Sequence, residues 1–167
     1  KNKSFTHVFL QAGVGGMAAA VIAGIAKYSK KISKIIIVEP DKAECVLRSI
    51  KKTKPVKIKI LDESIMGGMS CGEVSKVPWN ILKTSANYCV SISDNMVGPV
   101  MSSLSKKTYS NVKIEGGECA TPGIIALNSI YFNLVLKNKM KLNNKSKVLI
   151  FGCEGATDKK MYKKLIK

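Results

Sequence analysis

The feature that most constrains the fold is a cluster of glycines placed directly after a short apolar run. The run Val8-Phe9-Leu10 precedes Gly13, Gly15 and Gly16, and a helical pattern begins at Met17. This order predicts a strand, a tight turn and the N-terminus of a helix. Backbone N–H groups at such a terminus lack helical partners, and the helix dipole favours an anion there. The sequence therefore predicts a phosphate-binding loop.

Two cofactors compete for this loop. The spacing Gly13-x-Gly15-x-x-Ala18 fits the fingerprint of dinucleotide-binding folds, and Glu39 follows the next strand pattern, where such folds place a ribose-binding acid. Pyridoxal phosphate is the rival, because its single phosphate can use the same kind of loop. A third reading gives the glycines no ligand and lets them only bring the helix close to the sheet.

Composition narrows the possible partners. The 167 residues are enough for one domain with a core, and the net charge is +17. Arg48 is the only arginine and the lysines are spread through every segment, so the charge does not form a nucleic-acid-binding face. No apolar run reaches the roughly 20 residues that span a bilayer. We therefore expect neither nucleic acid nor a membrane as partner.

The cysteines and the histidine point away from a metal site. The five cysteines are well separated and form no C-x-x-C pair: Cys45, Cys71, Cys89, Cys119 and Cys153. This usage predicts reduced thiols and a cytoplasmic protein rather than a disulfide framework or a zinc site. His7 lies within the first strand pattern, where a packed histidine is expected. We expect no metal.

The pattern alternates between strands and helices along the whole chain. The expected strands are 6–11, 34–39, 56–60, 88–93 and 147–152. The expected helices are 16–29, 41–51, 78–87, 94–106, 118–137 and 157–166. Strands joined by helices predict an α/β fold with an open, mostly parallel sheet flanked by helices, and ligands bind beyond the carboxyl ends of its strands. The glycine-containing stretch 62–77 is expected to be a functional or interface loop.

Six segments, taken in order, resemble one family. They are residues 6–16, 38–43, 65–73, 78–82, 117–118 and 154–158. Together they are similar to the C-terminal part of the diaminopropionate ammonia-lyase family, pyridoxal-phosphate enzymes of fold type II, the tryptophan-synthase-β type. The resemblance covers nearly the whole chain, and it implies an incomplete fold of this type with residues 1–167 as its C-terminal portion and the N-terminal half absent.

The resemblance implies a set of cofactor-binding residues. Those carried over are Gly13, Val14, Gly15, Gly16 and Met17 around the phosphate, Glu118 beside the pyridoxal ring, and Cys153 near the pyridine nitrogen. The sequence departs from the family beside Glu118, where Cys119 and Ala120 stand in place of serine and glycine. Thr157 and Asp158 could either cap the helix that follows or lie beside the ring, and both alternatives remain open.

The resemblance also implies an activity. The complete enzyme would convert the small amino acid 2,3-diaminopropionate to pyruvate and ammonia by α,β-elimination, as a homodimer. The Schiff-base lysine and the acid/base residues are expected upstream, so no catalytic residue is assigned in this chain and the chain alone is expected to be inactive. The alternatives are a serine or threonine ammonia-lyase of the same fold, a nicotinamide-binding Rossmann domain, and an inactive module that pairs with another subunit.

Overall fold

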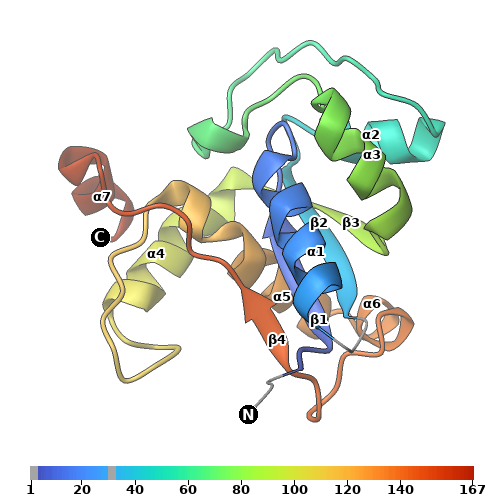
Figure 1. Cartoon of the computed structure of the whole chain (residues 1–167). Coiled ribbons are helices and arrows are strands. Elements are labelled where there is room, and N and C mark those ends of the chain that lie inside the picture. The colour runs from blue at the N-terminus through green and yellow to red at the C-terminus, as the bar shows by residue number, and fades with distance from the viewer. Residues whose placement is uncertain (1–3, 30–32) are drawn as a thin grey trace.

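A four-stranded parallel sheet forms the centre of the computed structural model, which describes residues 4–29 and 33–167 (Figure 1). The strands lie in the order β3-β2-β1-β4 and every neighbouring pair is parallel. Their bounds are β1 (His7–Gln11), β2 (Lys34–Pro40), β3 (Tyr88–Ile92) and β4 (Val148–Ile150). The order turns back between β1 and β4, because β2 and β3 follow on one side of β1 and β4 lies on the other. Open α/β sheets bind ligands at such a point.

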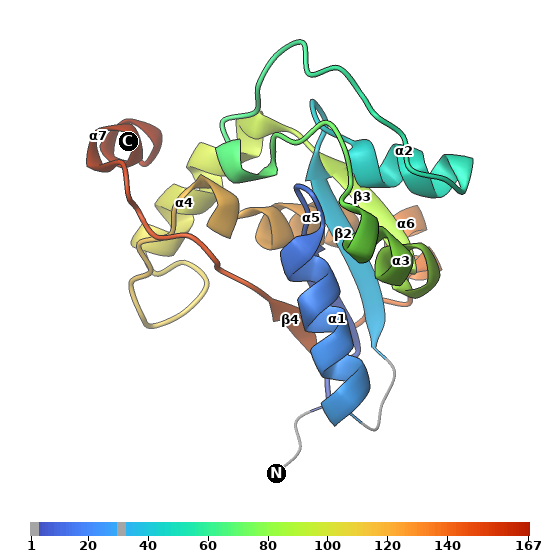
Figure 2. The same ribbon diagram turned by 45° about the horizontal axis from the view of Figure 1, so that its top comes forward.

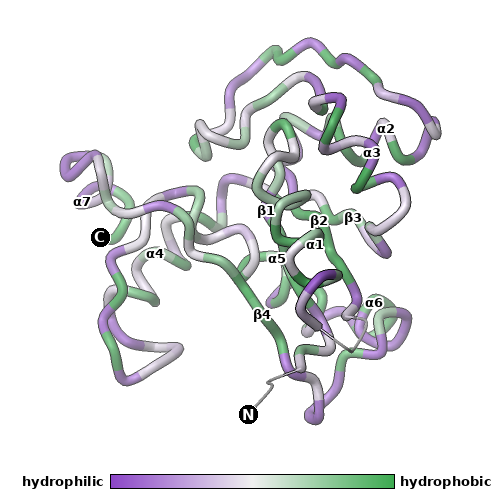
Figure 3. Tube along the Cα trace, viewed as in Figure 1, coloured by the Kyte–Doolittle hydropathy of each residue, from purple (hydrophilic) through white to green (hydrophobic). Residues whose placement is uncertain are grey.

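Alternate strand residues serve two separate cores. Val8 and Leu10 of β1 face one core, whereas Phe9 between them faces the other. Both sets are fully buried, so the central strands are continuously apolar (Figure 3). This is the pattern of a parallel sheet that is covered on both faces. The sequence prediction of an open parallel α/β sheet is therefore confirmed.

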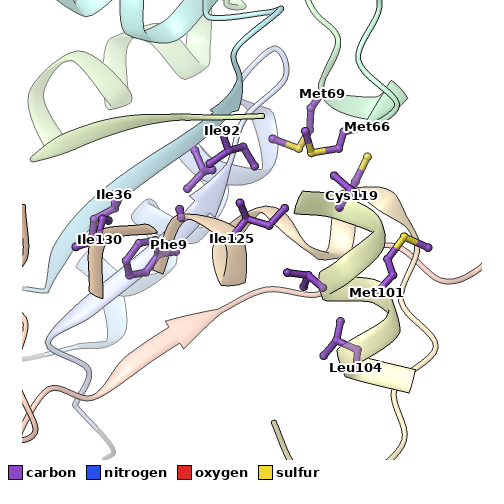
Figure 4. Close-up of a cluster of buried hydrophobic side chains, with 14 of the residues drawn as sticks. Phe9, Ile36, Met66, Met69, Ile92, Met101, Leu104, Cys119, Ile125 and Ile130 are labelled. Atoms are coloured by element: carbon purple, nitrogen blue, oxygen red, sulfur yellow. The ribbon is translucent and has the colours of Figure 1, made fainter. Parts of the chain in front are cut away.

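Helices cover both faces of the sheet. On one face, α1, α2 and α3 pack against the core that contains Val8, and on the other, α5 packs against Phe9 with α4 and α7 beyond its end (Figures 1, 2 and 4). The helix bounds are α1 (Gly16–Tyr28), α2 (Cys45–Lys52), α3 (Lys76–Ser85), α4 (Val97–Ser105), α5 (Pro122–Tyr131), α6 (Leu134–Lys139) and α7 (Lys159–Leu165).

Three expected elements differ most from the structure, and two more are shorter than expected: β4 covers three residues of the expected strand 147–152, and residues 94–96 of the expected helix 94–106 form a 3-10 turn before α4. Residues 56–60 form no strand: they run extended along the surface, and the Ile58 N–H donates to Gly72 O (2.8 Å) without joining the sheet. The expected helix 118–137 is divided, because Pro122 starts α5 and the Asn133 side chain caps α6 by accepting from the Leu136 N–H (3.0 Å). Helix α2 begins at Cys45, four residues later than expected at residue 41.

His7 is part of the packing, as expected. Its ring is buried, with Nε2 2.9 Å from Met140 O and Nδ1 2.8 Å from the Thr6 hydroxyl. Within the described residues, no group of three or more acidic, histidine or cysteine side chains is arranged to hold a metal ion. None of the helices in residues 4–29 and 33–167 has the length and apolar character needed to cross a membrane.

Candidate functional site

A cavity of about 340 Å³ opens at the carboxyl ends of β1 and β4. Four segments line it: the loop after β1, the 3-10 turn Gly67–Met69, the turn at Cys119, and the segment after β4. The lining residues are Gln11, Gly13, Val14, Gly15, Gly16, Met17, Gly68, Met69, Cys119, Cys153 and Glu154. The cavity lies where the strand order turns back, so the fold and the glycine loop indicate the same site.

The glycine loop has little room for side chains. Gly15 is the N-cap of α1 and has φ 90°, a left-handed conformation that favours glycine. A Cβ atom on Gly15 would lie 2.8 Å from Leu82 Cδ1 of α3, and one on Gly13 would lie 2.7 Å from Gly68 O. A Cβ on Gly16 would meet nothing within 4 Å. Glycine is therefore required at 13 and 15, where the loop fits between α3 and the Gly67–Met69 turn.

The N-terminus of α1 is left open to the cavity. It has no side-chain cap and no acidic residue in its first turn, so the backbone N–H groups of that turn stay available to a ligand. The N-terminus of α2 is different, because the Glu39 carboxylate accepts from the N–H groups of Val46 and Leu47 (2.7 Å each). The chain thus fills one helix N-terminus with its own carboxylate and leaves the other for an external anion.

Glu39 cannot serve as the ribose-binding acid of a dinucleotide site. Its side chain is 1% exposed and both carboxylate oxygens already bond to α2. Burial raises the pKa of Glu39 to about 7, against the opposing effect of the two backbone N–H groups. The acid that favoured a nicotinamide cofactor is a helix cap.

Glu154 joins the segment after β4 to the turn at Cys119. Its Oε2 accepts from the Cys119 N–H (2.5 Å), and its backbone oxygen accepts from the Gly117 N–H (3.0 Å). A Cβ on Gly117 would lie 2.8 Å from Glu154 Oε2, so glycine lets the two segments approach. Burial, and then the Glu154 charge, raise the pKa of the Cys119 thiol to about 12. Cys119 is a neutral wall of the cavity.

The structure brings most, but not all, of the predicted site residues to the cavity. Gly13 to Met17 and Cys153 all line the cavity, whereas Glu118 does not, and Cys119 takes that place. Sequence reasoning did not assign Gln11 or Glu154 to the site, although both stand within the segments that carried the resemblance. Their positions at the ends of β1 and β4 were the signal that could have found them. Asp158 caps α7, accepting from the N–H groups of Lys160 and Met161 (2.9 Å each).

Asp94 fixes the long loop that ends in the Gly67–Met69 turn. Its carboxylate accepts from the Ser64 hydroxyl (2.6 Å) and the Ile65 N–H (3.2 Å), and it pairs with Lys42 Nζ (3.2 Å). The Asp94 side chain is 13% exposed, so these bonds are shielded from water. The loop is held to the ends of β2 and β3, and its turn reaches the cavity.

Comparisons with known proteins agree on one family. The family model for pyridoxal-phosphate dependent enzymes matches residues 1–121. The diaminopropionate ammonia-lyase of Escherichia coli (strain K12) is 35% identical over 165 residues, which cover 96% of this chain and 42% of that protein. The chain thus spans less than half the length of this relative.

Solved structures extend the comparison. A crystal structure of diaminopropionate ammonia-lyase from Escherichia coli, in complex with D-serine, is 36% identical with a TM-score of 0.86. That match covers 98% of this chain and 42% of the other. Threonine deaminase isoform 2 from Solanum lycopersicum, in its processed form, has a TM-score of 0.75 at 17% identity, covering 98% of this chain and 44% of the other. At that identity the likeness shows the fold alone.

Proposed function

Because this chain belongs to the family of pyridoxal-phosphate dependent enzymes, we propose that it forms the part of a longer lyase that binds the cofactor phosphate. The proposed reaction of the complete enzyme is the conversion of 2,3-diaminopropionate to pyruvate and ammonia. The observation that carries the proposal is the open N-terminus of α1 in the cavity at the turning point of the sheet. The matches to diaminopropionate ammonia-lyases along 96% of the chain support the substrate.

The residues present fit the cofactor. Gly15, Gly16 and Met17 surround the open helix N-terminus, and the space beside Gly16 leaves its backbone accessible to phosphate oxygens. A cavity of about 340 Å³ lies in the range of small-molecule sites. Gln11 Oε1 is buried in the cavity wall without a hydrogen-bond partner in the described residues. These features favour a phosphorylated ligand with polar groups.

Each wall of the cavity has its own part in the proposed reaction. When bound, pyridoxal phosphate supplies an electron sink for the carbanion that forms beside the amino group. Gly13 to Met17 would hold the phosphate, Cys153 would offer the pyridine nitrogen a thiol partner, and the Cys119 turn would border the ring. Glu118 belongs to the same turn, although its side chain does not line the cavity. Met69 is 3% exposed and helps to exclude water.

The groups that move protons are proposed to come from the rest of the enzyme. No lysine of the described residues lines the cavity. The Schiff-base lysine and the acid/base residues are therefore assigned to the part of the lyase that this chain does not match. We further propose that the complete enzyme is a cytoplasmic homodimer that acts on a small amino acid.

Val14 gives a matched test of the phosphate site. Its side chain is 45% exposed and lines the cavity, and the residue directly precedes Gly15, the N-cap of α1. Val14→Asp places a negative charge at the open N-terminus, so in the full-length protein we expect pyridoxal phosphate to bind at least about tenfold more weakly. Val14→Asn has the same size without the charge and should bind within about threefold of the parent. Equal affinities of the two variants in an absorbance titration would contradict the proposed site.

The substrate is tested by comparing amino acids on the full-length enzyme. Release of pyruvate from 2,3-diaminopropionate is expected to have a higher kcat/KM than release of keto acid from serine or threonine. Preference for serine or threonine would support the related ammonia-lyase instead. Absence of pyridoxal phosphate from a protein that binds NADH would contradict the proposed cofactor.

A further inference from the structure

Gln11 joins three segments of the cavity wall through one buried carboxamide. It is the last residue of β1 and 4% exposed. Its Nε2 lies 2.9 Å from Cys119 O, 2.8 Å from Phe151 O and 3.2 Å from Cys153 Sγ. Two of these acceptors belong to the segment that follows β4, and the third to the turn at Cys119. The side chain therefore crosses from β1 to both neighbouring walls.

The surroundings decide which way the carboxamide points. Two carbonyl oxygens, of Cys119 and Phe151, face one end of the Gln11 group, so that end must be the NH₂. Turning the group over would bring its oxygen against both carbonyl oxygens. In the described residues Gln11 Oε1 has no hydrogen-bond partner, although it is buried. An unpartnered buried oxygen is unfavourable, so this orientation indicates that the NH₂ group is required on the side of Cys119 and Phe151.

The direction of the amide sets the chemistry of the Cys153 thiol. The amide carries two hydrogens for three acceptors, so a hydrogen that bonds one of the carbonyl oxygens is also shared with Cys153 Sγ, and the thiol donates its own hydrogen elsewhere. One acceptor is Cys119 O at 3.7 Å, which already accepts from Gln11 Nε2. The other direction is the cavity, which Cys153 lines. The Cys153 thiol can therefore donate its hydrogen to an acceptor in the cavity.

We propose that Gln11 is a positioning residue that makes Cys153 a hydrogen-bond donor toward an unprotonated aromatic nitrogen in the cavity. This rests on the proposed function, in which that nitrogen belongs to the pyridine ring. Gln11 does not touch the reacting atoms in this arrangement. It acts through the thiol, by holding Sγ in place and occupying its acceptor side.

The first test measures the thiol without the cofactor. In the cofactor-free full-length protein, the alkylation rate of Cys153 with iodoacetamide at pH 7.5 is followed by peptide mass spectrometry, in parallel for the parent and for Gln11→Met. Cys153 is exposed, so access does not limit its reaction. The amide N–H stabilises the reactive thiolate, so Gln11→Met should slow Cys153 roughly three- to tenfold relative to the parent. An unchanged or higher rate in a folded variant overturns the proposal.

A second variant covers a failure of folding. If Gln11→Met does not fold, Gln11→Glu has nearly the same shape and replaces the donor by an acceptor. Its negative charge beside Cys153 Sγ should slow alkylation further than the loss of the donor alone. A Gln11→Glu protein that is alkylated at the parent rate contradicts the proposal equally.

The second test uses the bound cofactor and separates the two proposals. In the parent, saturating pyridoxal phosphate should slow Cys153 alkylation at least tenfold. Failure of this protection, or of binding, contradicts the proposed function and leaves the first test of Gln11 intact. In the loaded protein, Gln11→Met and Cys153→Ala should change the pH dependence of the cofactor absorbance in the same direction, and Cys153→Ser should keep the parent profile. A parent profile in Gln11→Met argues against the positioning role.

Discussion

Glu39 makes a prediction about stability that can be worked out from its surroundings. Its carboxyl group is buried at the N-terminus of α2, and its pKa is raised from an ordinary value of 4.5 to about 7, with burial as the largest cause. Glu39→Gln removes the titration but keeps the size of the side chain. The difference in unfolding free energy between parent and variant should therefore depend on pH.

The sign follows from proton binding. Between pH 4.5 and 7 the folded state holds a proton on Glu39 that the unfolded chain has released, so the stability of the parent falls as the pH rises. A shift of this size corresponds to about 3 kcal/mol over the whole window, present as a penalty above pH 7 and absent below pH 4.5. Relative to Glu39→Gln, the parent should thus lose about 3 kcal/mol between pH 4.5 and pH 8.

Denaturant unfolding at several pH values measures this difference. Trp79 is the only tryptophan of the chain and is buried in the same core as Val46 of α2, so its fluorescence reports on this region. The control is Glu73→Gln, which removes a carboxylate that is 57% exposed and pairs with Lys57 at 4.0 Å, so the pH dependence of the parent should persist in this variant. A Glu39→Gln difference that is independent of pH, or that grows in favour of the parent as the pH rises, would refute the reasoning.

Two further substitutions test the walls of the cavity. Gly15→Ala puts a side chain at a left-handed residue and against Leu82, so it should lower the unfolding free energy by about 1–3 kcal/mol. Gly24→Ala, in open space on α1, should raise it by about 0.5–1 kcal/mol in the same thermal or denaturant assay. Equal effects of the two substitutions would contradict the strain at position 15. Asp94→Asn weakens the charge-assisted bonds from the Ser64 hydroxyl and the Ile65 N–H, so amide exchange at Ile65 should rise roughly tenfold or more. Asp62→Asn, at a carboxylate that is 75% exposed, is its control, and a similar rise there would argue against the role of Asp94.

The sequence was sufficient where one local signal determines the structure. Strands β1 and β2 are continuous apolar runs, and the turn between β1 and α1 needs the glycines at 13 and 15, so this unit could be predicted. The helix at 118–137 could not be bounded, because its breaks depend on Pro122 as a start and on the Asn133 cap. The extended residues 56–60 have the composition of a strand, but only tertiary structure shows that no sheet edge receives them.

The lining of the cavity was predictable in part. The glycine loop is contiguous in the sequence, and the resemblance named together five of its residues that line the cavity. The opposite wall joins residues that are far apart: Gln11 contacts Cys153 across 142 positions and Cys119 across 108. No periodicity or spacing carries such a contact. The resemblance assigned Glu118 to cofactor binding beside the ring, and the cavity lining contains its neighbour Cys119 but not Glu118.

The position of β4 has a consequence for how the cavity comes into being during synthesis. His7 pairs with Val148, and ribosomes add roughly 5–20 residues per second, so about 7–28 s pass between the synthesis of β1 and that of this neighbour. During that interval one edge of β1 is unpaired beside a growing chain, which is a hazard for misassembly. The glycine loop can form early, but Cys153 arrives only with β4. A nascent chain therefore presents one wall of the cavity well before the wall that follows β4 exists.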